Sequence, residues 1–335
     1  LIYIGLLVYE RIKTDYDNIC VCPIIKRWNL FAIRPIIRLI KERHIDLVSL
    51  QYVPHGYHIK GLPFSLIALL YAIRKYNVKI FTFCHELFVG WEKGNLKRNI
   101  LSFFMRNITK CIILQSDFVA TSIKVYQQQV NDLIRYKKLI GLISIGSNIP
   151  EVSVDAESLY SLRTKIATTD ECIVSFWGFR RINEILPVLL DSCNVLNIKL
   201  MSIGNSSPNM PEDNRIYKTG ILPLNEIVSY LRISDILILP EDFFSGCSFK
   251  SGTLVAALKN GVTVLTNKGR MTDETLVDGF NIVYTDFNDN RVFLNSLTWL
   301  VKHPEERERI GGNAKHLLSH ISWESIYAGY MDWMS

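Results

Sequence analysis

The segment with the most definite chemistry is residues 246–253, which join an apolar run to a helical pattern. Helix N-termini offer unpaired backbone N–H groups and a partial positive charge, so they favour phosphate groups. Gly252 would let a ligand approach the backbone, Ser251 and Thr253 carry hydroxyls, and Lys250 adds a full positive charge. We therefore predict a phosphate-binding site here, whose fixed donors would stabilise negative charge. The alternative is that Ser251 or Thr253 only caps the helix.

A second cationic group follows another predicted strand. Arg180 and Arg181 come shortly after an apolar pattern at 172–177. Ligands of open α/β sheets bind at the carboxyl ends of the strands, so these arginines are candidates for contact with a bound ligand. The alternative is that both are ordinary surface arginines on a loop.

Candidate catalytic residues follow a strand pattern at 79–84. His85 comes directly after it, with Glu86 beside it. A histidine can polarise a hydroxyl group near neutral pH, although His85 could equally satisfy a structural hydrogen bond. Polar residues after a neighbouring strand could form an acceptor site: Gln51, Tyr52, His55 and His58.

The elements that must position these residues are short apolar runs alternating with amphipathic patterns. Such alternation predicts α/β domains with mostly parallel sheets and helices on both faces. A polar stretch at 150–169 marks the join. We predict two Rossmann-like domains, 1–155 and 156–320, which face a central cleft, and a closing helix at 321–335 that packs back on the first. Strands are predicted at 18–25, 45–51, 79–84, 111–115, 117–121, 140–144, 172–177, 199–203, 215–218, 235–239 and 263–266, and helices at 35–44, 62–76, 96–109, 123–133, 184–193, 224–232, 252–260 and 304–335.

Composition and charge narrow the class of protein. With 48% apolar and 21% charged residues the chain is typical of globular proteins. Residues 1–150 contain 21 basic and 9 acidic residues, a net charge of +12, whereas the remainder carries −6 of the total of +6. A basic first half suits an anionic membrane surface or a lipid diphosphate. No motif supports a nucleic-acid partner. The alternative is a basic domain paired with an acidic one in solution.

Other features concern redox state, membrane spans and completeness. The seven cysteines are scattered without a CxxC pair, so we expect reduced, buried thiols in a cytosolic protein. The longest apolar run, 62–73, is shorter than the ~20 residues that a spanning helix needs. The sequence begins with Leu1 rather than Met, so we expect a piece of a longer chain.

Several segments, taken together and in order, resemble the retaining GT-B nucleotide-sugar glycosyltransferases of family 4, or group 1. The resemblance runs from about residue 34 to residue 333. It rests on the motifs together with their order along the chain, because each motif alone is weak evidence. The motifs are DLVSLQYVP at 46–54, TFCHEL at 82–87, DFVATS at 117–122, IGSNIP at 145–150, FWG at 176–178, IG at 203–204, TG at 219–220, SDILILP at 234–240, FKSGTLVAALKNG at 249–261, DGFN at 278–281 and SWE at 322–324.

This resemblance implies a fold, an activity and residue roles. The fold would be GT-B, and the enzyme would be a hexosyltransferase-type enzyme resembling bacterial O-antigen or capsule glycosyltransferases. His85 would lie against the transferred sugar and Glu86 near the acceptor. The segment 246–253 would bind the diphosphate leaving group of the donor, and at least one of Arg180 and Arg181 would face the same diphosphate. Gly178, Gly204 and Ser248 would join this donor site.

The resemblance also implies partners. The donor would be a nucleotide-sugar co-substrate, and the acceptor a glycan or a polyprenyl-diphosphate-linked glycan. We expect no other cofactor and no metal, because no acidic cluster follows a strand. The protein would work in the cytoplasm, peripherally at the inner face of the cell membrane.

The sequence departs from the family pattern at two places. Many members carry two glutamates eight residues apart around the phosphate loop, where this chain has Ser248 and Ala256. Residues 1–10 are predicted to be the tail of the first helix, so the family's first strand and glycine turn would be missing. The missing acids and the missing glycine turn favour one alternative, a catalytically degenerate GT-B binding or scaffold subunit. A separate alternative is a GT-B nucleotide-sugar epimerase, which would need several acids and histidines converging in the cleft.

Overall fold

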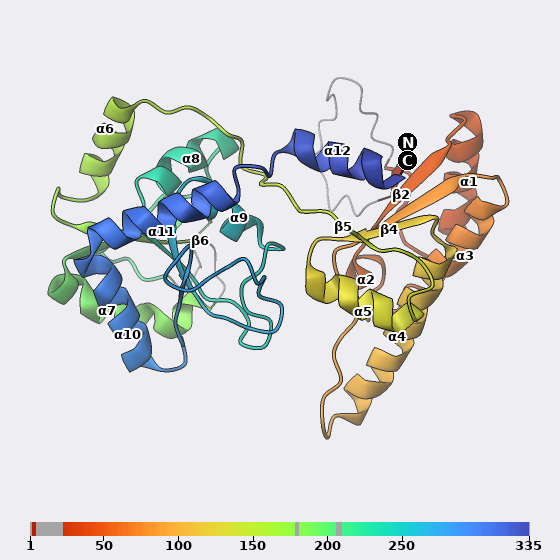
Figure 1. Ribbon diagram of the computed structural model, residues 1–335, viewed down its shortest axis with the longest axis horizontal. Coiled ribbons are helices and arrows are strands. Elements are labelled where there is room, and N and C mark those ends of the chain that lie inside the picture. Colours follow the sequence, from red (N-terminus) through yellow and green to blue (C-terminus); the bar gives the residue numbers. More distant parts are fainter. Residues whose placement is uncertain (1, 5–22, 178–180, 206–209, 335) are drawn as a thin grey trace. The chain divides into compact units, whose positions relative to one another are not determined.

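The structure is a computed structural model that describes residues 2–4, 23–177, 181–205 and 210–334. The chain divides into two compact units, each with its own parallel sheet (Figure 1). The first unit comprises Leu1–Ile143 and Gly329–Ser335, and the second comprises Ser144–Ala328. The domains predicted from the sequence, with bounds at 1–155, 156–320 and 321–335, stay a prediction.

In the described part of the first unit, five strands form one sheet in the order β1-β2-β3-β4-β5, and neighbouring strands are parallel. The side chains of β3 from Ile80 to Cys84 are buried, as expected of a parallel strand covered on both faces. The register pairs Tyr52 with Cys84, so β2 and β3 end side by side. The strands are β1 (Ile2–Ile4), β2 (Leu47–Tyr52), β3 (Lys79–Cys84), β4 (Phe118–Thr121) and β5 (Gly141–Leu142).

The helices of the first unit connect these strands, and one of them corrects a prediction. Residues 111–115 were expected to form a strand, but they are the last turn of α4. Ile108, Ile112 and Ile113 are all buried at helical spacing, so packing against the sheet favours the helix over the β-branched preference for a strand. The elements are η1 (Leu30–Ala32), α1 (Ile33–Glu42), α2 (Pro54–Tyr57), α3 (Phe64–Arg74), α4 (Leu96–Gln115) and α5 (Lys124–Ile134).

The start of the chain also differs from the expectation. Ile2–Ile4 forms β1, parallel to β2, rather than the tail of a helix. The predicted strand at 18–25 lies mostly outside the described residues, and its described part, 23–25, is not in a strand.

The second unit has a sheet of six parallel strands among its described residues, in the order β11-β10-β9-β6-β7-β8. The chain runs outward from β6 to β8 and then returns to place β9 on the other side of β6. The strand order therefore reverses between β6 and β9, which is the position where open α/β sheets bind ligands. The strands are β6 (Cys172–Trp177), β7 (Ile198–Ile203), β8 (Ile216–Lys218), β9 (Ile236–Leu239), β10 (Thr263–Thr266) and β11 (Val283–Tyr284).

Helices cover both faces of this second sheet (Figure 1). One apolar core lies between the sheet and helices α8 and α9, and a second core lies between the opposite face and helices α7 and α10. In α12, Trp323 donates its Nε1–H to the Ser147 carbonyl at 3.0 Å. The helices of the second unit are α6 (Ala156–Ile166), α7 (Ile182–Leu196), α8 (Leu224–Arg232), α9 (Gly252–Lys259), α10 (Asn290–Lys302) and α11 (Pro304–Leu317), whereas α12 (Trp323–Met334) begins in the second unit and ends in the first.

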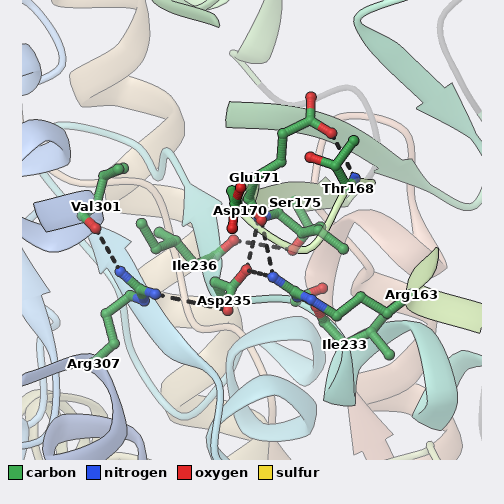
Figure 2. A network of polar contacts seen from close by, with 12 residues as sticks. Arg163, Thr168, Asp170, Glu171, Ser175, Ile233, Asp235, Ile236, Val301 and Arg307 are labelled. Carbon is green, nitrogen blue, oxygen red and sulfur yellow. Dashed lines mark hydrogen bonds and ion pairs between the residues drawn. The ribbon is translucent and has the colours of Figure 1, made fainter. Parts of the chain in front are cut away.

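A polar network at the amino ends of β6 and β9 fixes how these two strands lie (Figure 2). The Asp235 Oδ2 accepts the Ile173 N–H at 2.7 Å and an Arg163 N–H at 2.8 Å. Arg307 approaches the other carboxylate oxygen of Asp235 at 3.8 Å. One partly buried carboxylate thus joins β6, α6 and α11, and the network lies at the end of the sheet opposite the predicted donor site.

Candidate functional site

The loops after β6 and β9 meet where the strand order reverses. Arg181 precedes α7 and donates to the Glu241 carbonyl at 3.3 Å, and its guanidinium lies 3.4 Å from the Asp242 carboxylate. The predicted cation is therefore at the carboxyl end of the sheet, but it is paired with an acid. A small pocket beside these loops includes Pro240 and Asn267 in its lining. Gly178 and Arg180 lie outside the described residues.

The predicted phosphate segment forms the N-terminus of α9. Ser251 is the N-cap, and its hydroxyl accepts the Leu254 N–H at 3.4 Å, so the capping role is present for this residue. Gly252 begins the helix, is exposed, and has open space where a Cβ would stand. Lys250 and Thr253 are half-buried at the same terminus. The arrangement offers N–H groups, a hydroxyl and a nearby cation, which is the chemistry that binds a phosphate group.

The rest of this segment is in the core. Ser248 is buried, and its carbonyl accepts the Ser251 N–H at 2.9 Å. Ala256, at the second family glutamate position, is fully buried within α9. Neither residue offers a carboxylate to a ribose.

A loop that the sequence analysis missed, residues 267–273, holds the phosphate segment in place. The Cys247 N–H donates to the Asn267 carbonyl at 3.1 Å, and the Phe249 N–H donates to the Asp273 carboxylate at 2.9 Å. Because these bonds involve the backbone on both sides of Ser248, they hold the loop before α9 against residues 267–273. The sequence signal was a glycine three residues after the predicted strand at 263–266.

The two loops touch at glycines. A Cβ on Gly246 would lie 2.1 Å from the Gly269 backbone nitrogen, and Gly246 has φ +66°. Only glycine fits this contact, because an L-residue would meet both a backbone clash and an unfavourable left-handed conformation.

Gly204 follows β7 at the same end of the sheet. Its φ is +85°, and its N–H donates to the Thr219 hydroxyl at 3.0 Å. A Cβ there would lie 3.4 Å from the Trp177 indole nitrogen. The structure thus brings Gly204 beside the last residue of β6, next to the reversal point.

In the first unit, His85 and Gln51 come together at the ends of β3 and β2. The His85 Nε2 lies 2.8 Å from the Gln51 Oε1, and the Gln51 Nε2 donates to the Ser49 hydroxyl at 2.9 Å. The His85 N–H donates to the Tyr52 carbonyl at 3.1 Å. His85 is half-buried, whereas Glu86 is exposed.

The remaining predicted acceptor residues have structural partners. Tyr52 is fully buried with its hydroxyl 3.0 Å from the Thr109 hydroxyl, and burial raises its pKa. Its side chain therefore belongs to the core rather than to an acceptor surface. The His58 Nδ1 accepts the Lys60 and Leu62 N–H groups and so closes the loop after α2. His55 is exposed, with its Nδ1 3.4 Å from the Ile59 carbonyl.

Two other findings concern metals and membranes. Within the described residues, no three histidine, cysteine, aspartate or glutamate side chains gather as a metal site would require. Among the described helices, none combines the length and the apolar character needed to cross a bilayer.

Comparisons with known proteins agree with this architecture. No protein-family model matches the chain. An uncharacterized glycosyltransferase from Methanocaldococcus jannaschii is 21% identical over 253 residues, which are 71% of this chain and 63% of that protein. The match thus spans less than two thirds of this relative's length.

Solved structures similar to this chain are GT-B proteins. Sucrose-phosphate synthase from Thermosynechococcus elongatus has a TM-score of 0.66 at 15% identity, covering 90% of this chain and 76% of that one. HepE from Anabaena, solved with UDP, has a TM-score of 0.65 at 13% identity, covering 90% and 80%. WaaG, a glycosyltransferase involved in lipopolysaccharide biosynthesis, has a TM-score of 0.55 at 13% identity, covering 92% and 96%.

The chain therefore has the GT-B fold, with two Rossmann-like units. The resemblance to glycosyltransferases that the sequence motifs indicated is confirmed by the archaeal relative and by these structural neighbours.

Proposed function

We propose that this chain is a retaining glycosyltransferase. It transfers a sugar from a nucleoside-diphosphate sugar to a glycan or polyprenyl-diphosphate-linked acceptor in surface-polysaccharide synthesis. The observation that carries the proposal is the N-terminus of α9, with Lys250 beside it, at the carboxyl end of a GT-B second-unit sheet. The relation to WaaG supports the polysaccharide role, and HepE bound to UDP supports a nucleotide donor.

In this proposal the second unit holds the donor. The helix N-terminus and Lys250 bind the diphosphate and stabilise the negative charge that grows as the bond to the sugar breaks. Arg181 exchanges its Asp242 partner for a phosphate oxygen or orients that loop. With serine and alanine at the two family glutamate positions, ribose recognition differs from that of many family members.

The first unit supplies the acceptor side of the reaction. His85 polarises a sugar or acceptor hydroxyl, and the exposed Glu86 contacts the acceptor. The acceptor hydroxyl attacks the anomeric carbon on the face that the nucleotide leaves. Its proton passes to the leaving diphosphate as the bond from the sugar to that group breaks, so the anomeric configuration is retained. The chemistry rests on positioning and charge, and no metal is needed.

We also propose that the protein works peripherally at the inner face of the cell membrane. The excess of basic residues in the first 150 supports an anionic surface as partner. The exposed Trp91 and Leu96 near the start of α4, together with Lys93 and Lys97, offer apolar and cationic contacts to lipid headgroups.

A nucleotide screen tests the donor site. Thermal unfolding of the wild type is measured with UDP, GDP, dTDP, ADP and CMP, alongside Lys250→Ala and the control Lys302→Ala, an exposed lysine on α10. A nucleotide at 100 times its Kd stabilises the folded state by about 2.7 kcal/mol. We expect one nucleoside diphosphate to raise the unfolding midpoint of the wild type and the control, but not of Lys250→Ala.

Other outcomes decide against the proposal. Stabilisation by none of the nucleotides would overturn the transferase function. Binding of a nucleotide-sugar without transfer to any acceptor would favour the scaffold alternative instead.

A further inference from the structure

The pocket beside the β6 and β9 loops lies at the carboxyl end of the second-unit sheet, on the face that α7 covers. Its floor is formed by buried residues: Ile185, Pro240 and Asn267. Its empty volume is about 310 Å³, including the part that is open to solvent. This size is at the lower end of the range of small-molecule sites, roughly 300–1,000 Å³. The pocket therefore suits a ligand of the size of one sugar ring.

The rim of the pocket is polar and mostly acidic. The exposed side chains of Glu184 and Asp286 lie on it, and the Asn288 amide donates to the Asp286 carboxylate at 3.1 Å. Arg181 is also in the lining, but its guanidinium lies 3.4 Å from the Asp242 carboxylate. Carboxylates and amide oxygens accept hydrogen bonds from hydroxyl groups, whereas carboxylates repel an anion. The rim thus favours an uncharged ligand that carries hydroxyl groups.

One wall of the pocket is an exposed aromatic ring, Phe243, which is 54% exposed. The turn that carries it is fixed by Asp242, whose carboxylate accepts the Phe244 and Ser245 N–H groups at 3.1 Å each. The Asp242 carbonyl also accepts the Gly246 N–H at 2.7 Å. A ring held in this way offers a flat apolar face to the C–H groups of a ligand, and little freedom is lost when the ligand binds.

A buried hydroxyl group beside the pocket also indicates a polar ligand. Thr285 is 8% exposed, and its hydroxyl has no hydrogen-bond partner among the described residues. Its N–H continues the β11 pairing by donating to the Thr266 carbonyl at 2.8 Å. Val283 packs in the core on the α7 side and Tyr284 in the opposite core, so the alternation of side chains turns Thr285 towards the α7 side, next to Asp286. A buried hydroxyl without a partner is costly, and a ligand hydroxyl would satisfy it.

We infer that this pocket is a subsite for a neutral sugar ring, with Phe243 against the face of the ring and with Glu184 and Asp286 accepting its hydroxyl groups. The acidic rim makes the subsite selective against uronic acids, whose carboxylate would meet like charges. The inference deepens the proposed function and rests on it, because the sugar would belong to the donor or to the acceptor. Both sources share the same chemistry, an uncharged ring with several hydroxyl groups.

Saturation-transfer NMR of the full chain tests the subsite. The probes are the methyl glycosides of glucose, galactose and mannose, and sodium glucuronate. We expect the wild type to transfer saturation to at least one neutral glycoside and not to glucuronate. No signal from any neutral glycoside would overturn the subsite, and equal signals from glucuronate would overturn its selectivity.

Substitution of the aromatic wall locates the binding. Phe243→Ala should weaken binding of the neutral glycoside about fivefold or more, because the apolar face is lost. Phe243→Tyr should preserve binding, because it keeps the ring. Phe280→Ala is the matched control, since Phe280 is 51% exposed in the same unit and lies outside the pocket lining. Unchanged binding in Phe243→Ala, with the fold intact by circular dichroism, would contradict the inference.

A second pair of variants tests the acidic rim. Glu184→Gln combined with Asp286→Asn keeps the side-chain shapes and removes both charges, so glucuronate should now bind. Glu305→Gln combined with Glu308→Gln removes the same charge from exposed positions of α11 and should leave glucuronate unbound. If the rim variant still excludes glucuronate, the two carboxylates do not set the selectivity.

Competition distinguishes the two sources of the sugar and separates this inference from the proposed function. If the pocket holds the donor sugar, a nucleotide-sugar of the base found in the thermal screen should displace the methyl glycoside, whereas the nucleoside diphosphate alone should not. If the pocket holds an acceptor sugar, the glycoside should stay bound at a saturating concentration of the nucleotide-sugar. If the glycoside binds and responds to the variants but no nucleotide binds, the proposed function fails while the sugar subsite stands.

Discussion

At the scale of single residues, the contact between Gly246 and Gly269 decides whether the phosphate segment can form. We predict that Gly246→Ala destabilises the protein by roughly 2 kcal/mol or more, because the new Cβ meets backbone at 2.1 Å and the residue keeps a positive φ. The midpoint of thermal or urea-induced unfolding measures this loss.

Gly252→Ala is the matched control for that change. It lies in the same segment, but a Cβ there meets open space and the residue begins a helix. Its unfolding midpoint should stay close to that of the wild type. Equal destabilisation by both substitutions would show that the close approach of the two loops is not the cause.

The places of individual residues in the structure show what the sequence alone could and could not predict. The positions of His85, Gln51 and Gly204 at strand ends followed from apolar patterns that end in polar residues. The burial of Tyr52 did not, because it depends on a partner brought close by folding, Thr109 from α4. The bonds of His58 are local, to Lys60 and Leu62, but the loop conformation that forms them has no clear sequence pattern. Sequence pattern places a residue at the end of a strand, whereas packing decides which way its side chain points.

At the scale of elements, Asp235 joins the start of β9 to β6, α6 and α11 (Figure 2). We predict that Asp235→Ala destabilises the protein by about 2 kcal/mol, because it leaves the Arg163 guanidinium and the Ile173 N–H without their shared acceptor. Urea-induced unfolding, followed by circular dichroism, measures the change.

A second aspartate–arginine pair provides the comparison. Asp213 and Arg215 are 2.6 Å apart within one short turn, and among the described residues the Asp213 carboxylate itself contacts no other element, although Arg215 also donates to the Leu190 carbonyl of α7. Asp213→Ala should therefore cost clearly less than Asp235→Ala. A similar loss in both variants would mean that the link between elements adds nothing beyond a local ion pair.

Elements were predictable where apolar runs were bounded by clear turns. The bounds of β3, β6, α8 and β10 agree with the sequence pattern. The apolar run at 111–115 was ambiguous, because a short run with β-branched residues suits a buried strand or a buried helix turn equally well. Helix α10, at Asn290–Lys302, was missed although Asp289 caps its first turn.

At the scale of the whole molecule, cysteines report how each unit opens. Of the five cysteines in the described ranges, Cys111 is exposed, whereas Cys84, Cys172, Cys193 and Cys247 are buried. The expectation of buried thiols therefore holds for these four and is wrong for Cys111, which lies in α4. Burial raises the pKa of Cys84 and Cys172 to about 12 and that of Cys193 and Cys247 to about 11.

These differences predict different rates of labelling by iodoacetamide, which mass spectrometry of each cysteine peptide measures. The thiolate is the reactive form, so at pH 8 the folded protein should react quickly at Cys111 and slowly at the four buried thiols. Each slow rate then measures the opening of the surrounding core. Cys84 reports on the first unit, and Cys172, Cys193 and Cys247 report on the second.

A bound nucleotide should change the cysteine labelling rates of the two units differently. A ligand that binds only the folded second unit stabilises that unit, so a saturating nucleoside diphosphate should slow labelling of Cys172 and Cys193, both away from the α9 N-terminus, while the Cys84 rate stays unchanged. The Cys111 rate is the control for any direct effect of the nucleotide on the reagent. Equal slowing at Cys84 would mean that the two units open together, and no slowing at Cys172 or Cys193 would place the nucleotide outside the second unit.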